Sequence, residues 1–266
     1  MATGKRWIRE ELLVLLNIYE KLPFGQFDED QKVVQDIAKQ MDRTPGSVAM
    51  KLCNLASLDP KVKARGRKGL TGASNLDREM WAEFHTHENE LAPQSEAAFR
   101  NLFAAKDEDE VELVKGVGVR VQKSPMPFSG PTEAITEINA RRGQQYFRQV
   151  VLNAFDSQCC VTGIRVRELL IASHIKPWKP FPKDRLNPQN GLSLSRLHDA
   201  AFDRGMITFD EAYRLVLSKN LKKHLPQITL ERNFADFEGQ SMIIPVKSLA
   251  PSQEFLSFHR HQIFRG

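Results

Sequence analysis

The sequence predicts an α+β protein with a helical domain in its N-terminal part and a strand–loop–strand–helix unit in its C-terminal part. Near the N-terminus, apolar residues recur at helical spacing from Leu12 to Leu22, and the pattern stops at Pro23. Further along, two short apolar runs at 169–172 and 192–194 flank a loop rich in proline and lysine. An amphipathic segment follows the second run directly, which completes the strand–loop–strand–helix order.

Composition fits a globular protein with room for two modest domains. The chain has 266 residues, of which 41% are hydrophobic and 27% charged. No apolar run reaches the roughly 18 residues of a membrane span, and the N-terminus lacks the apolar stretch of a signal peptide. We therefore expect a soluble, cytoplasmic protein that does not bind membranes.

Cysteine content and net charge narrow the classes further. Cys53, Cys159 and Cys160 are too few for a disulfide framework, and the adjacent pair is not the CxxC spacing of a zinc ribbon. The net charge of +5 mildly favours a polyanionic partner.

Residues 7–58 are expected to form three helices, of which the third follows a short turn. The second helix should run over about 30–41, and Thr44 before Pro45 is a good start for a third over about 45–58. This order resembles a helix-turn-helix or Myb-like unit, whose last helix enters the DNA major groove. Ser47, Lys51 and Asn54 are predicted on its outer, DNA-facing side. A protein-docking or purely structural role is the alternative.

A basic segment and a helical extension complete the predicted recognition region, residues 1–105. The segment 60–73 contains no acidic residue and is predicted to be a flexible linker, either solvated or in contact with DNA phosphates through Arg65, Arg67 and Lys68. Residues 75–105 are predicted to be helical. An acidic stretch and then a Gly-, Pro- and Ser-rich one make 106–130 the expected linker to a second domain at 131–266.

Three polar residues recur in order around the strand–loop–strand unit. His174 ends the first apolar run, Asn190 follows sixteen residues later, and His198 follows after eight more. The intervening loop carries several basic residues, among them Lys176, which suits either a solvated or a phosphate-facing loop. A histidine with a pKa near 6.5 can accept a proton from water at neutral pH, as hydrolysis of an anionic phosphodiester requires.

The short motifs around these residues resemble those of the HNH endonucleases, which have the ββα-metal fold, and in particular those of the restriction-type members. The matching motifs are C-x-T-G at 160–163, S-H-I-x-P-W at 173–178, N-G-L-x-L at 190–194 and H-D-x-x-F-D-x-G at 198–205. The resemblance implies that His174 is the general base, that Asn190 holds the hairpin loop and orients the base, and that His198 binds a catalytic metal ion.

One position departs from the family pattern. Many HNH enzymes have an Asp or His ligand just before the base, where this chain has Ser173. We expect Asp203 to supply the second metal ligand if the last helical turn unwinds, with Asp199 as the alternative; either could instead be a helix-surface charge. Mg²⁺ or Mn²⁺ suits such a site best, while Zn²⁺, Co²⁺ or Ni²⁺ can also fit.

The function expected from this pattern is a metal-dependent endonuclease of the restriction or phage-defence type that cuts double-stranded DNA. The alternative is a DNA-binding regulator with an inactive HNH fold, which the serine at position 173 suggests. A homodimer would place two single-strand-cutting sites on one duplex.

Overall fold

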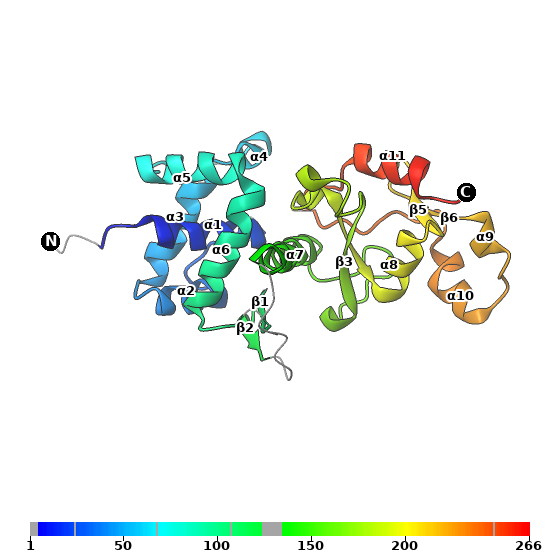
Figure 1. Ribbon diagram of the computed structural model, residues 1–266, viewed down its shortest axis with the longest axis horizontal. Helices are drawn as coiled ribbons and strands as arrows, with labels where there is room; N and C mark the ends of the chain where they lie inside the picture. Colours follow the sequence, from blue (N-terminus) through cyan, green and yellow to red (C-terminus); the bar gives the residue numbers. More distant parts are fainter. Residues whose placement is uncertain (1–4, 24, 68, 107, 124–134, 247) are drawn as a thin grey trace. The chain divides into compact units, whose positions relative to one another are not determined.

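The chain divides into two units, and each is described by itself. The computed structural model describes residues 5–266 except 24, 68, 107, 124–134 and 247 (Figure 1). Unit 1 is Met1–Gln149 and unit 2 is Val150–Gly266. The division falls inside the helix α7 (Ile135–Ala154). The predicted domain start at 131 and the residues up to 134 lie outside the described part. No helix among the described residues is long and apolar enough to cross a membrane.

Unit 1 is mainly helical and adds one small antiparallel sheet. Its elements before α7 are α1 (Arg9–Lys21), α2 (Lys32–Gln40), α3 (Pro45–Ala56), α4 (Pro60–Ala64), α5 (Asn75–Thr86), α6 (Glu88–Leu102), β1 (Glu110–Val114) and β2 (Gly118–Gln122). The three helices predicted over 7–58 are confirmed, including the Thr44 cap, whose side chain accepts a hydrogen bond from the Ser47 amide.

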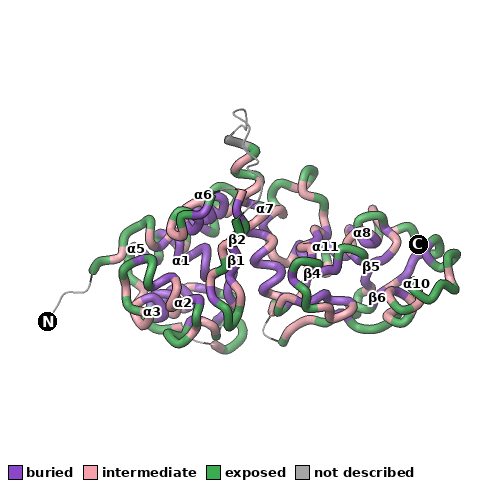
Figure 2. The backbone as a smooth tube through the Cα atoms, turned by 90° about the horizontal axis from the view of Figure 1, so that it is seen from below, coloured by how far each residue is buried: buried purple, intermediate pink, exposed green. Residues whose placement is uncertain are grey.

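The centre of unit 1 is α1, which packs against α3, α5 and α6. Figure 2 colours most of this helix as buried, and Leu12, Leu15, Leu16 and Ile18 have no exposed surface. The apolar spacing in the sequence therefore marks a helix enclosed by its neighbours rather than one with a single buried stripe.

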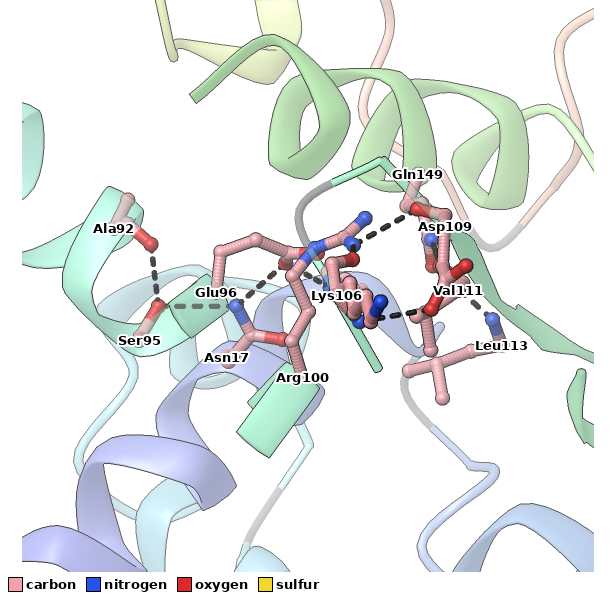
Figure 3. A network of polar contacts seen from close by, with 11 residues as sticks. Asn17, Ala92, Ser95, Glu96, Arg100, Lys106, Asp109, Val111, Leu113 and Gln149 are labelled. Carbon is pink, nitrogen blue, oxygen red and sulfur yellow. Dashed lines mark hydrogen bonds and ion pairs between the residues drawn. The ribbon is translucent and has the colours of Figure 1, made fainter. Parts of the chain in front are cut away.

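A buried polar network joins α1 to α6, and Figure 3 shows Asn17 of α1 beside Ser95 and Glu96 of α6. Lys21 forms an ion pair with Glu96, and both side chains are inaccessible to solvent. Burial lowers the pKa of Lys21, while the Glu96 carboxylate opposes that shift. Arg100, one helical turn after Glu96, donates to the carbonyls of Lys106 and Asp109 at 2.8 Å. The network thus extends from the helical core to the chain that leads into β1.

The linker predicted over 106–130 is wrong for its middle part. Residues 110–122 form the hairpin β1–β2, in which Glu110 pairs with Gln122 and Val114 with Gly118. The hairpin packs on α2, where the Asp36 carboxylate accepts from the Val119 amide at 3.0 Å. Gln149 holds it from α7 by donating to the Val111 carbonyl and accepting from the Leu113 amide (Figure 3). Residues 124–130 of the predicted linker lie outside the described part.

The structure also corrects the predicted outer face of α3. Lys51 and Asn54 are buried, with 7% and 8% of their surface exposed, and Lys51 Nζ lies 2.9 and 2.8 Å from the two carboxylate oxygens of Asp77 in α5. A helix has 3.6 residues per turn, so positions 51 and 54 flank the buried Val48–Leu52–Leu55 row on the same side, and Lys51 there faces Asp77 of α5. Met50, 58% exposed, and the half-buried Ser47 are what α3 presents outward.

The basic segment 60–73 is attached to α3 rather than free along its length. It contains the short helix α4, whose Val62 is buried, and the Leu70 amide donates to the Cys53 carbonyl at 3.1 Å. Gly69 makes this approach possible, because a Cβ there would collide with the backbone of Ser57 and Cys53. The predicted flexible linker is therefore wrong for these positions, and Lys68 lies outside the described residues.

Unit 2 carries two antiparallel strand pairs surrounded by short helices. Its elements after α7 are η1 (Arg167–Leu169), β3 (Leu170–His174), η2 (Pro182–Asp184), η3 (Pro188–Asn190), β4 (Gly191–Ser195), α8 (Arg196–Asp203), β5 (Ile207–Phe209), β6 (Leu215–Leu217), α9 (Lys219–Lys222), α10 (Ile228–Asn233), η4 (Ala235–Phe237) and α11 (Gln253–Gln262). The helix α8 contacts β3, β4 and β5. The predicted strand–loop–strand–helix order is confirmed.

The placement of Lys51 predicts a structural role for this residue. Lys51→Met should reduce the free energy of unfolding of the full chain by about 3–5 kcal/mol, because it leaves the buried Asp77 carboxylate without its counter-charge. Thermal or urea denaturation measures this loss. Lys32→Met is the matched control: Lys32 is 53% exposed and its partner Asp36 is 22% exposed and keeps its bond to the Val119 amide, so about 1 kcal/mol or less should be lost. Equal stability of the two variants would contradict this assignment.

Candidate active site

The hairpin β3–β4 sets the positions of the two predicted catalytic residues. His174, the last residue of β3, pairs with Gly191, the first residue of β4, and Ser173 pairs with Leu192. Asn190 directly precedes β4 and is 1% exposed. The loop that joins the strands therefore starts at His174 and returns beside it at Asn190.

The Asn190 side chain closes this loop with three hydrogen bonds. Its Oδ1 accepts from the Lys176 amide at 2.8 Å, and its Nδ2 donates to the carbonyls of Lys176 at 3.2 Å and Asp184 at 3.1 Å. An amide suits this position because it carries an acceptor and two donors on one planar group. This is the loop-holding geometry that the resemblance implied for Asn190.

The His174 ring is oriented by the same loop. Its Nε2 lies 3.0 Å from the Arg185 carbonyl oxygen, which can only accept, so Nε2 carries the proton and the ring lone pair is on Nδ1. The Trp178 ring lies edge-on to it, with centroids 5.3 Å apart. Burial lowers the pKa of His174, and the Arg185 carbonyl opposes that shift. His174 is therefore neutral at pH 7, the state that a base needs.

His198 differs from the expected metal ligand. The residue is fully buried, its Nδ1 lies 2.8 Å from the Ser195 hydroxyl, and its Nε2 lies 2.7 Å from the Asn233 carbonyl. Both ring nitrogens are thus engaged by protein groups, and burial lowers the ring's pKa. This geometry argues against coordination by His198 and indicates that it anchors α8 to the end of α10.

Asp199 and Asp203 form the acidic pair on α8. They are four residues apart and therefore lie on one face, whereas His198 and Asp203, five apart, do not. The helix runs without a break to Asp203, so the unwinding expected for its last turn is wrong. Partial burial raises the pKa of Asp199, and it also raises the pKa of Asp203, to about 6, with a further contribution from the Asp199 charge. Two carboxylates that oppose each other's ionisation are stabilised by a cation.

Ser173, the residue before the base, lies beside the acidic pair. Ser173 is 2% exposed, and its hydroxyl lies near enough to Asp199 to lower that carboxyl's pKa. Yet the hydroxyl has no partner of good hydrogen-bond geometry among the described residues. A buried polar atom without a partner is costly, so a bound ion or water beside Asp199 would satisfy it.

These donors fit a hard divalent cation. Mg²⁺ is held by one or two carboxylates and keeps several waters, which the pair Asp199 and Asp203 can provide for. Clusters of three or more His, Cys, Asp or Glu suited to a metal ion do not occur among the described residues. Two carboxylates and a hydroxyl are oxygen ligands, the kind that a hard divalent cation prefers.

The C-terminal end of α8 is fixed by a second buried histidine. His259 in α11 stacks on Phe202, with ring centroids 3.7 Å apart, and its Nε2 donates to the Phe202 carbonyl at 3.0 Å. Burial lowers the pKa of His259 to about 4, so the ring stays neutral. Gly205 ends the helix as predicted, with φ of 67° and the Met206 amide bonded back to Ala201. Asp203 therefore sits on a rigid helix end.

The sequence identified His174 and Asn190 at the loop, but it did not identify the Arg185 carbonyl that orients His174 or the contact between Ser173 and Asp199. Asp199 was placed second to Asp203, although Asp199 is the carboxyl that lies beside Ser173, the neighbour of the base in the chain. The Arg185 carbonyl carries no side-chain signal and could not have been found from residue types. The sequence did offer one signal for Asp199, its position directly after His198. Adjacent residues of a helix face different neighbours, so a buried His198 leaves Asp199 free to face another part of the fold.

A comparison with protein families identifies this region. Residues 159–210, about a fifth of the chain, match the model of the HNH endonuclease family. The match runs from before β3 to the end of β5, and it includes the proposed base, Asn190 and the acidic pair. No curated protein shows significant sequence similarity to the chain. Unit 2 thus contains an HNH endonuclease domain, a class that acts on nucleic acids and generally uses a divalent metal ion.

The raised pKa values predict how cation binding depends on pH. A carboxyl with a pKa of about 6 is mostly protonated at pH 5.5 and ionised at pH 7.5, so Mn²⁺ should bind more weakly at the lower pH. Calorimetry of the full chain with Mn²⁺ at both values measures this. Asp199→Asn and Asp203→Asn should each weaken binding, whereas Asp210→Asn, outside the pair, is the control. Binding unaffected by either substitution would remove the acidic pair from the site.

Proposed function

We propose that the protein is a metal-dependent DNA endonuclease of the restriction or phage-defence type, in which unit 2 cuts and unit 1 binds DNA. The observation that carries the nuclease proposal is the His174 ring, held with its lone pair on Nδ1 at the end of a hairpin that matches the HNH family. The lowered pKa of His174 supports its role as the base.

The proposed reaction is hydrolysis of a phosphodiester bond. The Nδ1 of His174 accepts a proton from a water molecule as that water attacks the phosphorus. The bond from phosphorus to the 3′-oxygen breaks, and the leaving oxygen takes a proton from solvent, which gives a 5′-phosphate and a 3′-hydroxyl. Asn190 and the Arg185 carbonyl hold the ring so that this lone pair keeps one direction throughout the step.

Asp199 and Asp203 are the residues that would hold the divalent cation, with the Ser173 hydroxyl beside them. The cation supplies Lewis-acid stabilisation of the charge that develops on the phosphate and the leaving oxygen. A cation held by these carboxylates would lie beside Ser173, which directly precedes the proposed base in β3.

DNA binding by unit 1 is supported by its charge distribution rather than by the face of α3 first expected. Exposed basic residues follow α3 along α4 and beyond it, including Lys61, Lys63 and Arg65. Such charges attract the phosphate backbone without reading its sequence. Ser47 and Met50 remain on the outer side of α3, where a methyl-bearing or hydroxyl side chain can contact base edges.

The catalytic proposal predicts the effect of removing the base. His174→Ala should lower the cleavage rate of plasmid DNA by about 10²–10⁴-fold, because a general base acts in the transition state, and should leave DNA affinity within about twofold. Single-turnover cleavage with Mg²⁺ or Mn²⁺ and filter binding give the two values. His224→Ala, an exposed histidine, is the control and should cut normally. Near-normal cleavage by His174→Ala would falsify the proposal for His174.

The recognition proposal predicts a salt effect. Changing Arg65, Arg67 and Lys68 together to Ala should weaken binding to all DNA sequences, because phosphate contacts carry no base information. The slope of log affinity against log salt should become shallower by about 0.9 for each phosphate that the variant no longer neutralises. Filter binding over a series of salt concentrations measures this slope.

The matched control removes the same charge from unit 2, at the exposed residues Lys219, Lys223 and Arg232. Equal effects of the two triple variants would mean that net charge alone attracts DNA. An unchanged salt slope in the first variant would exclude the segment 60–73 from the interface.

A further inference from the structure

Lys176, two residues after the base, is enclosed by the protein rather than directed at a substrate. Its Nζ lies 2.6 Å from the Asp184 carboxylate, and only 14% of its side chain is exposed. The same nitrogen lies 4.4 Å from the ring centroid of Phe181, 5.0 Å from that of Phe255 and 5.8 Å from that of Phe258. An ammonium near three aromatic rings and a carboxylate gains both cation–π and ionic attraction.

These contacts connect the start and the middle of the hairpin loop to α11. Phe255 and Phe258 belong to α11, and Phe258 also packs edge-on against Phe181 of the loop, with centroids 5.0 Å apart. Asp184, the partner of Lys176, is followed by Arg185, whose carbonyl accepts from His174. Arg185 in turn donates from Nε to the Trp178 carbonyl at 2.8 Å, which closes the loop on itself.

We propose that Lys176 is a positioning residue for His174: its ammonium, between Asp184 and the α11 rings, holds the Arg185 carbonyl where it fixes the His174 tautomer. This proposal rests on the nuclease function proposed above. The Asn190 amide holds the backbone of the same loop but does not reach α11. Lys176 therefore ties the Asp184–Arg185 part of the loop to α11, and Asn190 supplies the internal closure of the loop. The last part of the loop has its own attachment, because Gln189 bonds to the backbone of Ala250 and Ser252.

The variant Lys176→Met keeps most of the side-chain volume and removes the charge. With the loop released, the reacting water and the Nδ1 lone pair are misaligned, and kcat should fall about 10–100-fold while KM changes less than about threefold. Lys176→Arg should recover most of kcat, because a guanidinium can pair with Asp184 and stack on the same rings. Lys183→Met, an exposed lysine of the same loop, is the matched control and should keep both constants.

A second readout does not depend on activity. In ¹⁵N-histidine-labelled protein, the Nε2–H proton of His174, assigned by its loss in His174→Ala, should be protected from exchange by the Arg185 carbonyl. The signal should persist in the wild type, Lys176→Arg and Lys183→Met, and should be broadened or lost in Lys176→Met. Asp184→Asn is the second variant and should give the same loss. When Lys176→Met and Asp184→Asn are combined, the loss of signal and of kcat should be no larger than in either single variant, because the two residues act as one pair.

The outcomes separate this proposal from the proposed function. If the wild type cuts no DNA but the Nε2–H signal disappears in Lys176→Met, the nuclease proposal fails and the positioning role stands. If Lys176→Met and Asp184→Asn retain both the signal and kcat, the positioning role is overturned. A rise in KM with unchanged kcat and signal would also overturn it, because Lys176 would then act as a DNA contact.

Discussion

The hydrogen bond from His174 Nε2 to the Arg185 carbonyl is the constraint on which the site depends. It assigns the proton to one ring nitrogen and the lone pair to the other, which a free imidazole would exchange between the two. The bond exists because Asn190 closes the loop internally and because Lys176 and Asp184 attach it to α11. Thus the loop backbone, rather than a carboxylate, orients the proposed base. A carboxylate there would raise the pKa of His174, whereas burial in this loop lowers it.

The acidic pair on α8 depends on how the rest of that helix is buried. The buried residues of α8 hold His198 against Asn233 and Phe202 against His259, and this leaves Asp199 beside Ser173 with Asp203 one turn further along the helix. A serine in place of a ligand is compatible with the proposed metal site, in which two carboxylates of α8 would hold the cation.

Local patterns predicted the elements of the fold well. Leu12–Leu22 with Pro23, and Thr44 with Pro45, specify helices through spacing and capping, and the two apolar runs around His174 and Asn190 specify the hairpin. The direction in which a side chain faces was harder to predict. Lys51, Asn54 and His198 are polar residues on amphipathic helices, and their burial depends on partners distant in sequence, such as Asp77 for Lys51.

The prediction of a linker over 106–130 was wrong in its middle part for a related physical reason. Its acidic and glycine-rich composition is typical of an exposed connection, but Arg100 and Gln149 bind its backbone from helices on either side in the sequence. Two strands of five residues need such support, because an isolated hairpin is only marginally stable in water. The contribution of tertiary contacts is not encoded in the local pattern that suggested a linker.

The measurement that tests the central claim most directly is the pH dependence of DNA cleavage at saturating Mn²⁺, where the bound cation keeps the Asp199 and Asp203 carboxylates ionised. With His174 as the base, the logarithm of the rate should rise with a slope of about one below a pKa lower than 6.5 and level off above it. A cleavage rate that does not fall as the pH is lowered below 6.5 would contradict the account, as would the absence of cleavage with any divalent cation.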